Sequence, residues 1–282
     1  MEFEKWQALG NDYMIVEAED LPFPLTPARI QAMCAAHTGV CADGVLLLSQ
    51  DGPQDPPELR VFNPDGSEAE VSGNGAREAI MYLHRHGRAG QDGSALQTAA
   101  GQLQPKILSP TTCSVDMGQA SLHSSDYPDG DPSGRGRLWA GGREWEFQHV
   151  KIGNPQCSIG LEDEAGLAAL DLTALGPEIE HHELFPHRTN VSWYAVLAPD
   201  RLRARIFERG AGETTASGTG AIGAAVAHVV SGGTSPVTVV LDGGELEVAV
   251  ASDLQIGLTG WAVPVFRGAL AEDFIQELHA LQ

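Results

Sequence analysis

The sequence is poor in basic residues, and in lysine above all. It has 17 lysines and arginines against 38 aspartates and glutamates, which gives a formal net charge of −21. A surface that binds nucleic acid needs clustered Lys and Arg, so this composition argues against a nucleic-acid partner. Lysine occurs only at Lys5, Lys106 and Lys151. None of the three stands beside a recognisable motif, so the chain offers no clear lysine for a Schiff-base cofactor.

Metal-binding cysteines and long apolar runs are also missing. The cysteines, Cys34, Cys41, Cys113 and Cys157, do not have the spacing of metal ligands, so we expect free, buried thiols in preference to a disulfide, and no metal site. No apolar run approaches the roughly 20 residues of a membrane span, so we expect no membrane partner. The first residues do not form a cationic stretch before an apolar core, so we expect no signal peptide and a cytoplasmic protein.

One stretch, in contrast, occurs twice. Residues 68–76 read Glu-Ala-Glu-Val-Ser-Gly-Asn-Gly-Ala and residues 213–221 read Glu-Thr-Thr-Ala-Ser-Gly-Thr-Gly-Ala, which places Ser72 and Ser217 145 positions apart. Each copy follows a strand-like run and precedes an apolar stretch of helical length. The first N–H groups of a helix lack intrahelical partners and carry partial positive charge, so they bind anions. Two copies predict two such helix ends serving one anion site, with a serine at each.

The chain also shows the pattern of a duplicated fold. Strand-like segments outnumber helical ones, and each half holds one long apolar helix, at 76–83 and 221–230. This predicts an α+β fold of two pseudosymmetric domains, each with a sheet wrapped around a central apolar helix. Further strands are expected at 2–18 with a turn at 9–12, 45–48, 58–62, 94–118, 145–152, 190–197, 201–208, 237–241 and 245–251. Further helices are expected at 28–36, 171–179 and 271–281, and a turn at 153–156.

Composition indicates one region where the two halves meet. Residues 119–142 are rich in Gly, Ser, Pro and Asp, which is typical of a boundary region. We therefore assign residues 1–118, together with the C-terminal segment 262–282, to an N-terminal half, and residues 119–261 to a C-terminal half. A chain of 282 residues is long enough for two domains of this size.

Six segments, in order and spacing, resemble diaminopimelate epimerase. They are Leu-Gly-Asn-Asp-Tyr (9–13), Asn-Pro-Asp-Gly-Ser (63–67), Ser-Gly-Asn-Gly-Ala-Arg (72–77), Gly-Asn-Pro-Gln (153–156), Glu-Arg-Gly-Ala-Gly-Glu-Thr (208–214) and Ser-Gly-Thr-Gly-Ala (217–221). The resemblance implies an interdomain active site that inverts the α-carbon of LL-diaminopimelate to the meso form, for lysine and peptidoglycan, without cofactor or metal. It also implies a small diamino diacid as the binding partner, and a homodimer is a further expectation.

The resemblance also implies roles for individual residues. Ser72 and Ser217 occupy the two acid/base positions. The amides of Gly73 and Asn74, and of Gly218 and Thr219, would hold the carboxylate beside the reacting carbon, in agreement with the anion site read from the repeat. The remaining substrate-binding residues would be Asn11, Asn63, Asn154, Asn190, Glu208 and Arg209. Arg209 suits the distal carboxylate because its planar guanidinium can bond it bidentately.

The departures from the family fall on the chemistry. The family has a cysteine at each position held here by Ser72 and Ser217, and a histidine where this chain has Gln156. A thiol ionises near pKa ~8.5 and a hydroxyl closer to water's ~15.7, a gap of about 7 units or roughly 9–10 kcal/mol. A helix N-terminus returns at most about 2 kcal/mol. The serines therefore need activation by a neighbour, or Glu208 or Glu213 takes the proton instead.

Several alternatives stay open at this point. The protein could be a natural branch in which the acid–base set changed together, an engineered Cys-to-Ser trap, a catalytically silent binder, or an isomerase, racemase or lyase for another amino acid. Residues 218–223 match Gly-x-Gly-x-x-Gly, but they do not directly follow a strand, so tight helix packing explains Gly223 better than a dinucleotide site. Residues 181–183, His-His-Glu, are best explained as a solvated loop.

Overall fold

A computed structural model of the chain describes residues 1–52, 55–69, 72–90 and 93–281. Glu70 and Val71, inside the first copy of the repeated motif, lie outside the described residues, and so does Gln282. Two compact units make up the chain, residues 1–115 with 260–282 and residues 116–259. The expected limits between the two halves, at 118/119 and 261/262, stay predictions.

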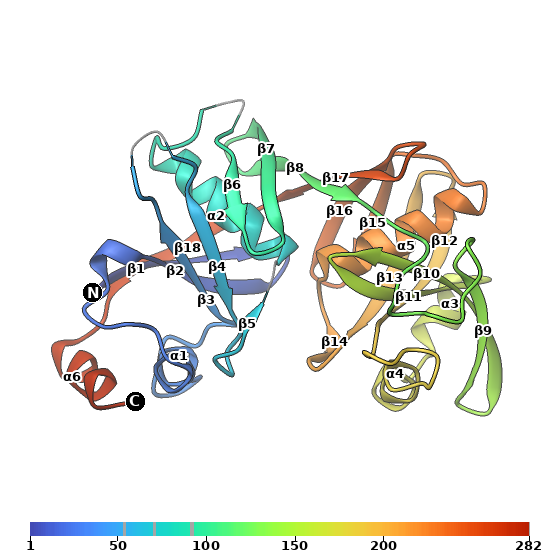
Figure 1. The fold of residues 1–282 in the computed structure, drawn as a ribbon, viewed down its shortest axis with the longest axis horizontal. Helices are drawn as coiled ribbons and strands as arrows, with labels where there is room; N and C mark the ends of the chain where they lie inside the picture. Colours follow the sequence, from blue (N-terminus) through green and yellow to red (C-terminus); the bar gives the residue numbers. More distant parts are fainter. Residues whose placement is uncertain (53–54, 70–71, 91–92, 282) are drawn as a thin grey trace. The chain divides into compact units, whose positions relative to one another are not determined.

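The first unit is a sheet that encloses one long helix. Its strand β1 pairs with β18 and β2, β2 runs parallel to β3, β3 pairs with β4, β4 pairs with β5 and β6, and β6 pairs with β7. Helix α2 packs against β1, β2, β3, β4 and β7 (Figure 1). The elements are β1 Glu2–Ala8, β2 Asn11–Glu17, η1 Ala18–Asp20, α1 Pro27–Cys34, β3 Val45–Ser49, β4 Glu58–Phe62, β5 Glu68–Ala69, α2 Gly73–Arg85, β6 Leu96–Thr98, β7 Gly101–Ser109, β18 Val263–Ala269 and α6 Glu272–Ala280, with β8 Thr112–Gln119 leading out of the unit.

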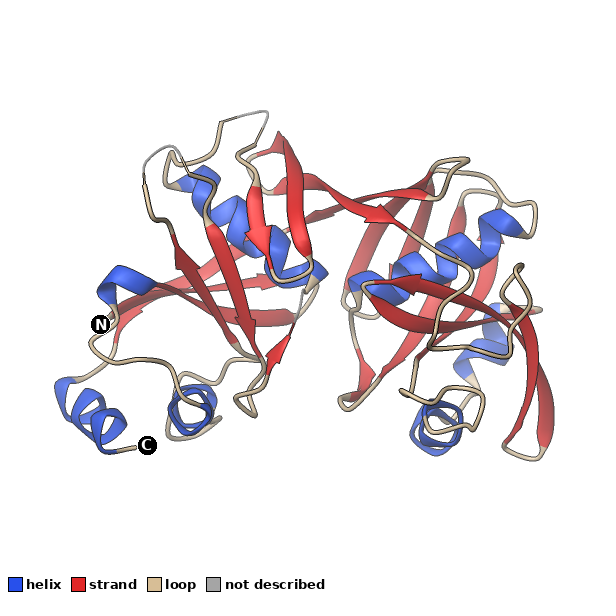
Figure 2. Ribbon diagram, viewed as in Figure 1, coloured by secondary structure: helices blue, strands red, loops and turns tan. Residues whose placement is uncertain are grey.

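The second unit has the same plan. Strand β10 pairs with β9 and β11, β11 runs parallel to β12, β12 pairs with β13, β13 pairs with β14 and β15, and β15 pairs with β16. Helix α5 packs against β10, β11, β12, β13, β15 and β16 (Figure 2). The elements are β9 Arg135–Ala140, β10 Arg143–Ile152, β11 Asn154–Leu161, α3 Glu164–Ala168, α4 Leu172–Glu180, β12 Asn190–Ala198, β13 Arg201–Glu208, β14 Gly212–Thr214, α5 Gly218–Val230, β15 Val237–Leu241, β16 Gly244–Val250 and β17 Gln255–Trp261.

The duplication extends to the register of single residues. The short strand before each central helix pairs with the strand before it in the same way, 145 positions apart. The pairs are Val61 with Ala69 and Phe62 with Glu68, and Ile206 with Thr214 and Phe207 with Glu213. The predicted α+β fold of two pseudosymmetric halves, each a sheet around a central helix, is therefore confirmed.

Both central helices are buried on nearly every side, which explains why α5 is apolar, whereas α2 also buries Arg77 and Glu78. In α5 every residue from Gly218 to His228 is buried. A Cβ at Gly223 would lie 2.9 Å from both Gln156 Cβ and Ser158 Oγ, so close packing accounts for this glycine. Among the described helices, none is long and apolar enough to cross a membrane.

Two expectations were wrong, those for residues 153–156 and for Cys41. The boundary region 119–142 contains strand β9, and the predicted turn 153–156 is mostly the start of strand β11. Only Gly153 turns, with φ of 68°. Pro155 misled the prediction, but a proline near the start of a strand removes few ladder hydrogen bonds. Strands β17 and β18 were not predicted, and Cys41 is exposed, whereas the other three cysteines are buried; all four are free.

Candidate active site

Ser72 caps the N-terminus of the first central helix. Its backbone is extended, with φ of −125° and ψ of 123°, and its Oγ accepts a 3.1 Å hydrogen bond from the amide of Gly75. The hydroxyl of Tyr13 donates a second hydrogen bond to the same Oγ, at 3.3 Å. Ser72 therefore has the geometry of a helix N-cap, as the repeat predicts. The amides of Gly73 and Asn74, which follow it, are among the helix's first donors.

Ser217 caps the second central helix in the same way. Its φ and ψ are −142° and 119°, and its Oγ accepts a 3.1 Å hydrogen bond from the amide of Gly220. Gly218 and Thr219 are the first residues of the helix, and Thr219, like Ser217, is buried. Each unit thus presents a serine beside the positive end of a helix dipole.

Glu208 distinguishes the second unit from the first. Its carboxylate accepts a 2.9 Å hydrogen bond from Thr214 Oγ1 and a further hydrogen bond from the Ser217 side chain. Burial raises the pKa of Glu208 above its ordinary value and outweighs both hydrogen bonds. The corresponding residue of the first unit is Asn63, whose Nδ2 donates to Ser67 Oγ at 3.0 Å. Only the second unit therefore pairs its N-cap serine with a carboxylate at this position.

Glu213, the other carboxylate considered for proton transfer, has a structural partner. Arg205 Nη2 lies 2.6 Å from its Oε1. The first unit repeats this ion pair between Arg60 and Glu68, at 2.8 Å. Because the pair recurs at equivalent positions of the two units, it gives Glu213 a structural role on the short strand before the helix.

In the first unit, Asn11 and Asn74 contact each other. Asn74 Nδ2 donates to Asn11 Oδ1 at 3.1 Å, and Asn11 Nδ2 donates to Asp43 Oδ2 at 2.9 Å. The buried guanidinium of Arg77 donates to Asn74 Oδ1 at 2.6 Å, and this hydrogen bond orients the Asn74 carboxamide. Asp43 and Arg77 were not assigned a role from the sequence, although Arg77 closes one of the six quoted segments.

In the second unit, Asn154, Gln156, Asn190 and Arg209 come together. Gln156 Nε2 donates to Asn154 Oδ1 at 2.6 Å, and Gln156 is the register partner of Asn190. The amide of Arg209 donates to Asn190 Oδ1 at 2.7 Å. Gln156 is fully buried, and its Oε1 lacks a hydrogen-bond partner among the described residues. A buried carbonyl without a partner is uncommon in folded proteins, which sets Gln156 apart from the other residues of this group.

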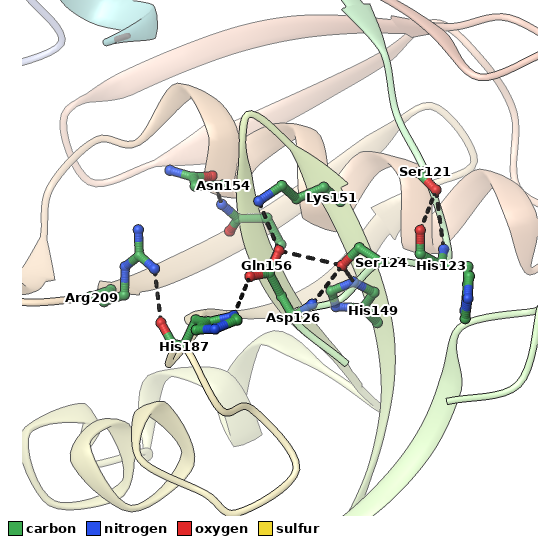
Figure 3. A network of polar contacts seen from close by, with 10 residues as sticks. All are labelled: Ser121, His123, Ser124, Asp126, His149, Lys151, Asn154, Gln156, His187 and Arg209. Carbon is green, nitrogen blue, oxygen red and sulfur yellow. Dashed lines mark hydrogen bonds and ion pairs between the residues drawn. The ribbon is translucent and has the colours of Figure 1, made fainter. Parts of the chain in front are cut away.

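A polar network behind these residues supports Arg209 (Figure 3). Arg209 Nη1 donates to the backbone carbonyl of His187 at 2.9 Å, and the ring of His187 lies 3.3 Å from Asp126. Lys151 Nζ donates to the same carboxylate at 2.7 Å. Burial raises the pKa of Asp126, but the hydrogen bonds and charges of Lys151 and His187 outweigh it and hold the pKa below its ordinary value. The sequence carried no signal for this network.

Ser124 and His149 belong to the same network but do not form a nucleophile–base pair. Their Oγ and Nε2 atoms are 2.9 Å apart, and burial lowers the pKa of His149 to about 4. Nδ1 of this fully buried ring lacks a partner in the described part of the chain. Burying an acceptor nitrogen without a partner costs less free energy than burying an N–H without one. Nδ1 is therefore the unprotonated nitrogen, and the ring donates from Nε2 to Ser124. Ser124 then donates onward to Asp126, 3.4 Å away.

His181 is the C-cap of helix α4 and is exposed, and His182 follows it outside the helix. Throughout the described residues, no three His, Cys, Asp or Glu side chains are grouped as metal ligands.

Comparison with known proteins gives one family. The model of the family described as diaminopimelate epimerase matches residues 3–123 and 148–264. The diaminopimelate epimerases of Synechococcus sp. (strain JA-3-3Ab) and Desulfitobacterium hafniense (strain DSM 10664 / DCB-2) are 43% and 38% identical to this chain. These alignments cover 96% and 97% of this chain and 99% of each relative.

Solved structures of low sequence identity share the fold. A predicted epimerase from Pseudomonas aeruginosa matches with a TM-score of 0.68 at 17% identity, over 95% of this chain and 98% of that one. A probable proline racemase from Agrobacterium radiobacter K84 matches with a TM-score of 0.67 at 15% identity, over 96% and 93%. The family model and the relatives extend this likeness to sequence, and the chain belongs to the diaminopimelate epimerase family.

Proposed function

We propose that this chain epimerises the α-carbon of an amino acid without a cofactor, converting LL-diaminopimelate to meso-diaminopimelate, with Ser72 and Ser217 as the groups through which the proton returns and leaves. Family membership supports the reaction, and the two capped helix ends support the binding of a carboxylate. The observation that carries the proposal is the hydrogen bond between Ser217 and the buried carboxylate of Glu208.

This hydrogen bond shows how a serine with a high pKa could take part in removing the α-proton. A hydroxyl near pKa ~15.7 cannot serve as a standing base, but a hydroxyl that passes its proton to a carboxylate can accept one at the same time. The α-carbon–hydrogen bond breaks as the proton moves to Ser217 Oγ, and the Ser217 proton moves to Glu208. Burial raises the pKa of Glu208, and a base is most effective when its pKa lies near the working pH.

The substrate would be held by the residues that the family resemblance implies. The amides of the two helix N-termini would bind the carboxylate beside the reacting carbon, and Arg209 the distal carboxylate. The unpartnered Gln156 Oε1 would accept a hydrogen bond from the substrate. The carboxamides of this set are Asn11, Asn63, Asn74, Asn154 and Asn190.

Proton NMR of LL-diaminopimelate in D2O tests the proposal. Loss of the α-proton signal together with formation of the meso isomer supports it. Binding measured by calorimetry with no exchange would show instead that the chain is a silent binder. Neither binding nor exchange would point to another amino acid as the substrate, and the same assay with a panel of amino acids would find it.

We also propose a cytoplasmic homodimer. Val265 and Phe266 of strand β18 are 53% and 44% exposed, and they lie beside a groove lined by Phe3, Leu270 and Phe274. Exposed apolar surface next to a groove is typical of a protein contact. Light scattering of the purified protein and of Phe266→Lys tests the dimer, and an unchanged monomeric mass for both would exclude it. Cell fractionation tests the location.

A further inference from the structure

Tyr13 and Gln156 are equivalent residues of the two halves. Each is the third residue after a glycine of positive φ, Gly10 at 83° and Gly153 at 68°. Tyr13 directly precedes Met14, the first residue of β2 that pairs with the parallel strand β3, and Gln156 is the first residue of β11 that pairs with the parallel strand β12. Tyr13 carries a phenol, which can exchange a proton, whereas Gln156 carries a carboxamide, which cannot.

Asn63 and Glu208 are a second pair of equivalent residues, and in this pair the titratable side chain belongs to the second unit. Asn63 directly follows β4 and Glu208 is the last residue of β13, 145 positions apart. Here the first unit has the carboxamide and the second the titratable group. Each unit therefore keeps one titratable side chain against its N-cap serine, and it comes from β2 in the first unit and from β13 in the second.

The hydrogen bonds give Ser72 the role of a donor. A hydroxyl has one proton and two acceptor lone pairs. Ser72 Oγ accepts from the amide of Gly75 at 3.1 Å and from the phenol of Tyr13 at 3.3 Å. With respect to the described residues, both lone pairs are used, so what remains to the hydroxyl is its own proton.

Ser217 has the opposite arrangement. Its Oγ accepts from the amide of Gly220 at 3.1 Å and its proton goes to Glu208. Among the described partners one lone pair is left, so this hydroxyl is ready to accept a proton. The two serines are alike in sequence and capping, yet in this state one is prepared to give a proton and the other to take one.

We propose that Tyr13 is the proton-relay partner of Ser72, as Glu208 is of Ser217, so that the resting protein is prepared to epimerise from one stereoisomer. The inference rests on the proposed function. When the proton leaves to Ser217 and Glu208, Ser72 gives its proton to the opposite face of the α-carbon and takes the phenolic proton of Tyr13. One carbon–hydrogen bond is broken and one formed, Glu208 gains a proton, and Tyr13 loses one.

The phenol makes this transfer reasonable in energy. Tyrosine ionises near pKa ~10, about 5 to 6 units below a hydroxyl near ~15.7. The relay therefore leaves the negative charge on the phenolate and not on the serine oxygen. The amide of Gly75 and the helix N-terminus face the Ser72 oxygen while its charge develops. Reaction from the other stereoisomer begins from the reverse state, with Tyr13 ionised and Glu208 protonated.

Tyr13→Phe tests the proposal because it removes one oxygen from a side chain of the same shape. We expect conversion between the stereoisomers to fall on the order of 10²- to 10⁴-fold, the range for loss of a proton donor. Washout of the α-proton in D2O should continue from the stereoisomer that presents its proton to Ser217, and stop from the other. Tyr194→Phe, a buried tyrosine of the second unit, is the matched control, and its conversion rate should stay at the parent's.

The outcomes separate this inference from the proposed function. A parent protein that exchanges neither stereoisomer would contradict the proposed function itself. A working parent with an equally active Tyr13→Phe, or a Tyr13→Phe that loses washout of both stereoisomers, would overturn the relay. A second test uses Ser72→Cys, whose thiol near pKa ~8.5 needs no relay. In the Ser72→Cys variant, adding Tyr13→Phe should lower the rate of conversion by less than about 10-fold. A fall as large as the one that Tyr13→Phe causes in the parent would overturn the relay.

Discussion

Arg209 and Asp126 are connected through a single residue, His187. The guanidinium of Arg209 donates to the His187 carbonyl at 2.9 Å, and the His187 ring lies 3.3 Å from the Asp126 carboxylate. Arg209 is also held by its backbone amide, 2.7 Å from Asn190 Oδ1. The side chain proposed to bind the distal carboxylate thus rests on a loop that a buried carboxylate anchors.

Asp126→Asn should therefore weaken substrate binding more than it slows proton transfer. The change removes the charge that Lys151 and His187 contact, so the loop carrying the His187 carbonyl loosens. We expect the Kd for diaminopimelate to rise about 10-fold and kcat to change less than about 3-fold, since only positioning is lost. Calorimetry and steady-state kinetics measure both, with exposed Asp129→Asn as control. Unchanged affinity would contradict the role of Asp126.

The pH dependence of the reaction should report Glu208. Burial raises the pKa of this carboxyl above its ordinary 4.5, and only the ionised form accepts a proton. kcat/KM should therefore fall as the pH drops through the raised pKa, with an acid limb above pH 4.5. Thr214→Val removes a hydrogen bond to the carboxylate, so the limb should move to higher pH.

Glu208→Gln completes this test. It should remove the acid limb and lower kcat on the order of 10²-fold or more. A raised carboxyl pKa also means that folding favours the protonated form, so the unfolding free energy falls as the pH rises through it. Glu208→Gln should accordingly unfold at the same temperature as the parent or higher at pH 7. Retention of the acid limb in this variant would assign it to another group.

Thiol-directed reagents should leave the parent enzyme active. Three of its cysteines are buried, and burial raises the pKa of Cys34 and Cys113 to about 12. Only Cys41 is exposed, and it is no part of the proposed site. The double variant Ser72→Cys with Ser217→Cys should be inactivated by iodoacetamide, because helix N-termini favour thiolates. Inactivation of the parent at the same rate would contradict the proposed assignment.

Glu213→Gln should affect stability and not chemistry. Its ion pair with Arg205 is partly exposed, and such pairs contribute about 1 kcal/mol or less. We expect exchange rates within about 3-fold of the parent, and Glu68→Gln in the first unit should behave alike because the pair recurs there. If Glu213→Gln abolished exchange while Glu208→Gln did not, the base would be Glu213.

Much of the fold could be predicted because local patterns determine it. Small residues after Ser72 and Ser217 open the central helices, and both serines are N-caps as predicted. Strand β11 was missed because Gly153 and Pro155 are typical of a turn, whereas its pairing with β10 and β12 decides the structure. Tertiary pairing of this kind leaves no local signal.

The candidate site was less predictable. The separate roles of Glu208 and Glu213 depend on which partner each reaches, Thr214 and Ser217 for one and Arg205 for the other. The spacing along the chain is compatible with either. Asp126 comes from a stretch whose composition indicated only a boundary, so its contacts with Lys151 and His187 could not be foreseen.

The serines at 72 and 217 also bear on how the protein responds to oxidants. A thiolate at a helix end is readily oxidised by peroxide, first to a sulfenic acid and then irreversibly. The groups proposed here to move the proton are two hydroxyls, a phenol and a carboxylate, and the cysteine at 157 is fully buried. A protein built this way needs no reducing environment to keep its proton-transfer groups intact, and peroxide would leave those groups chemically unchanged.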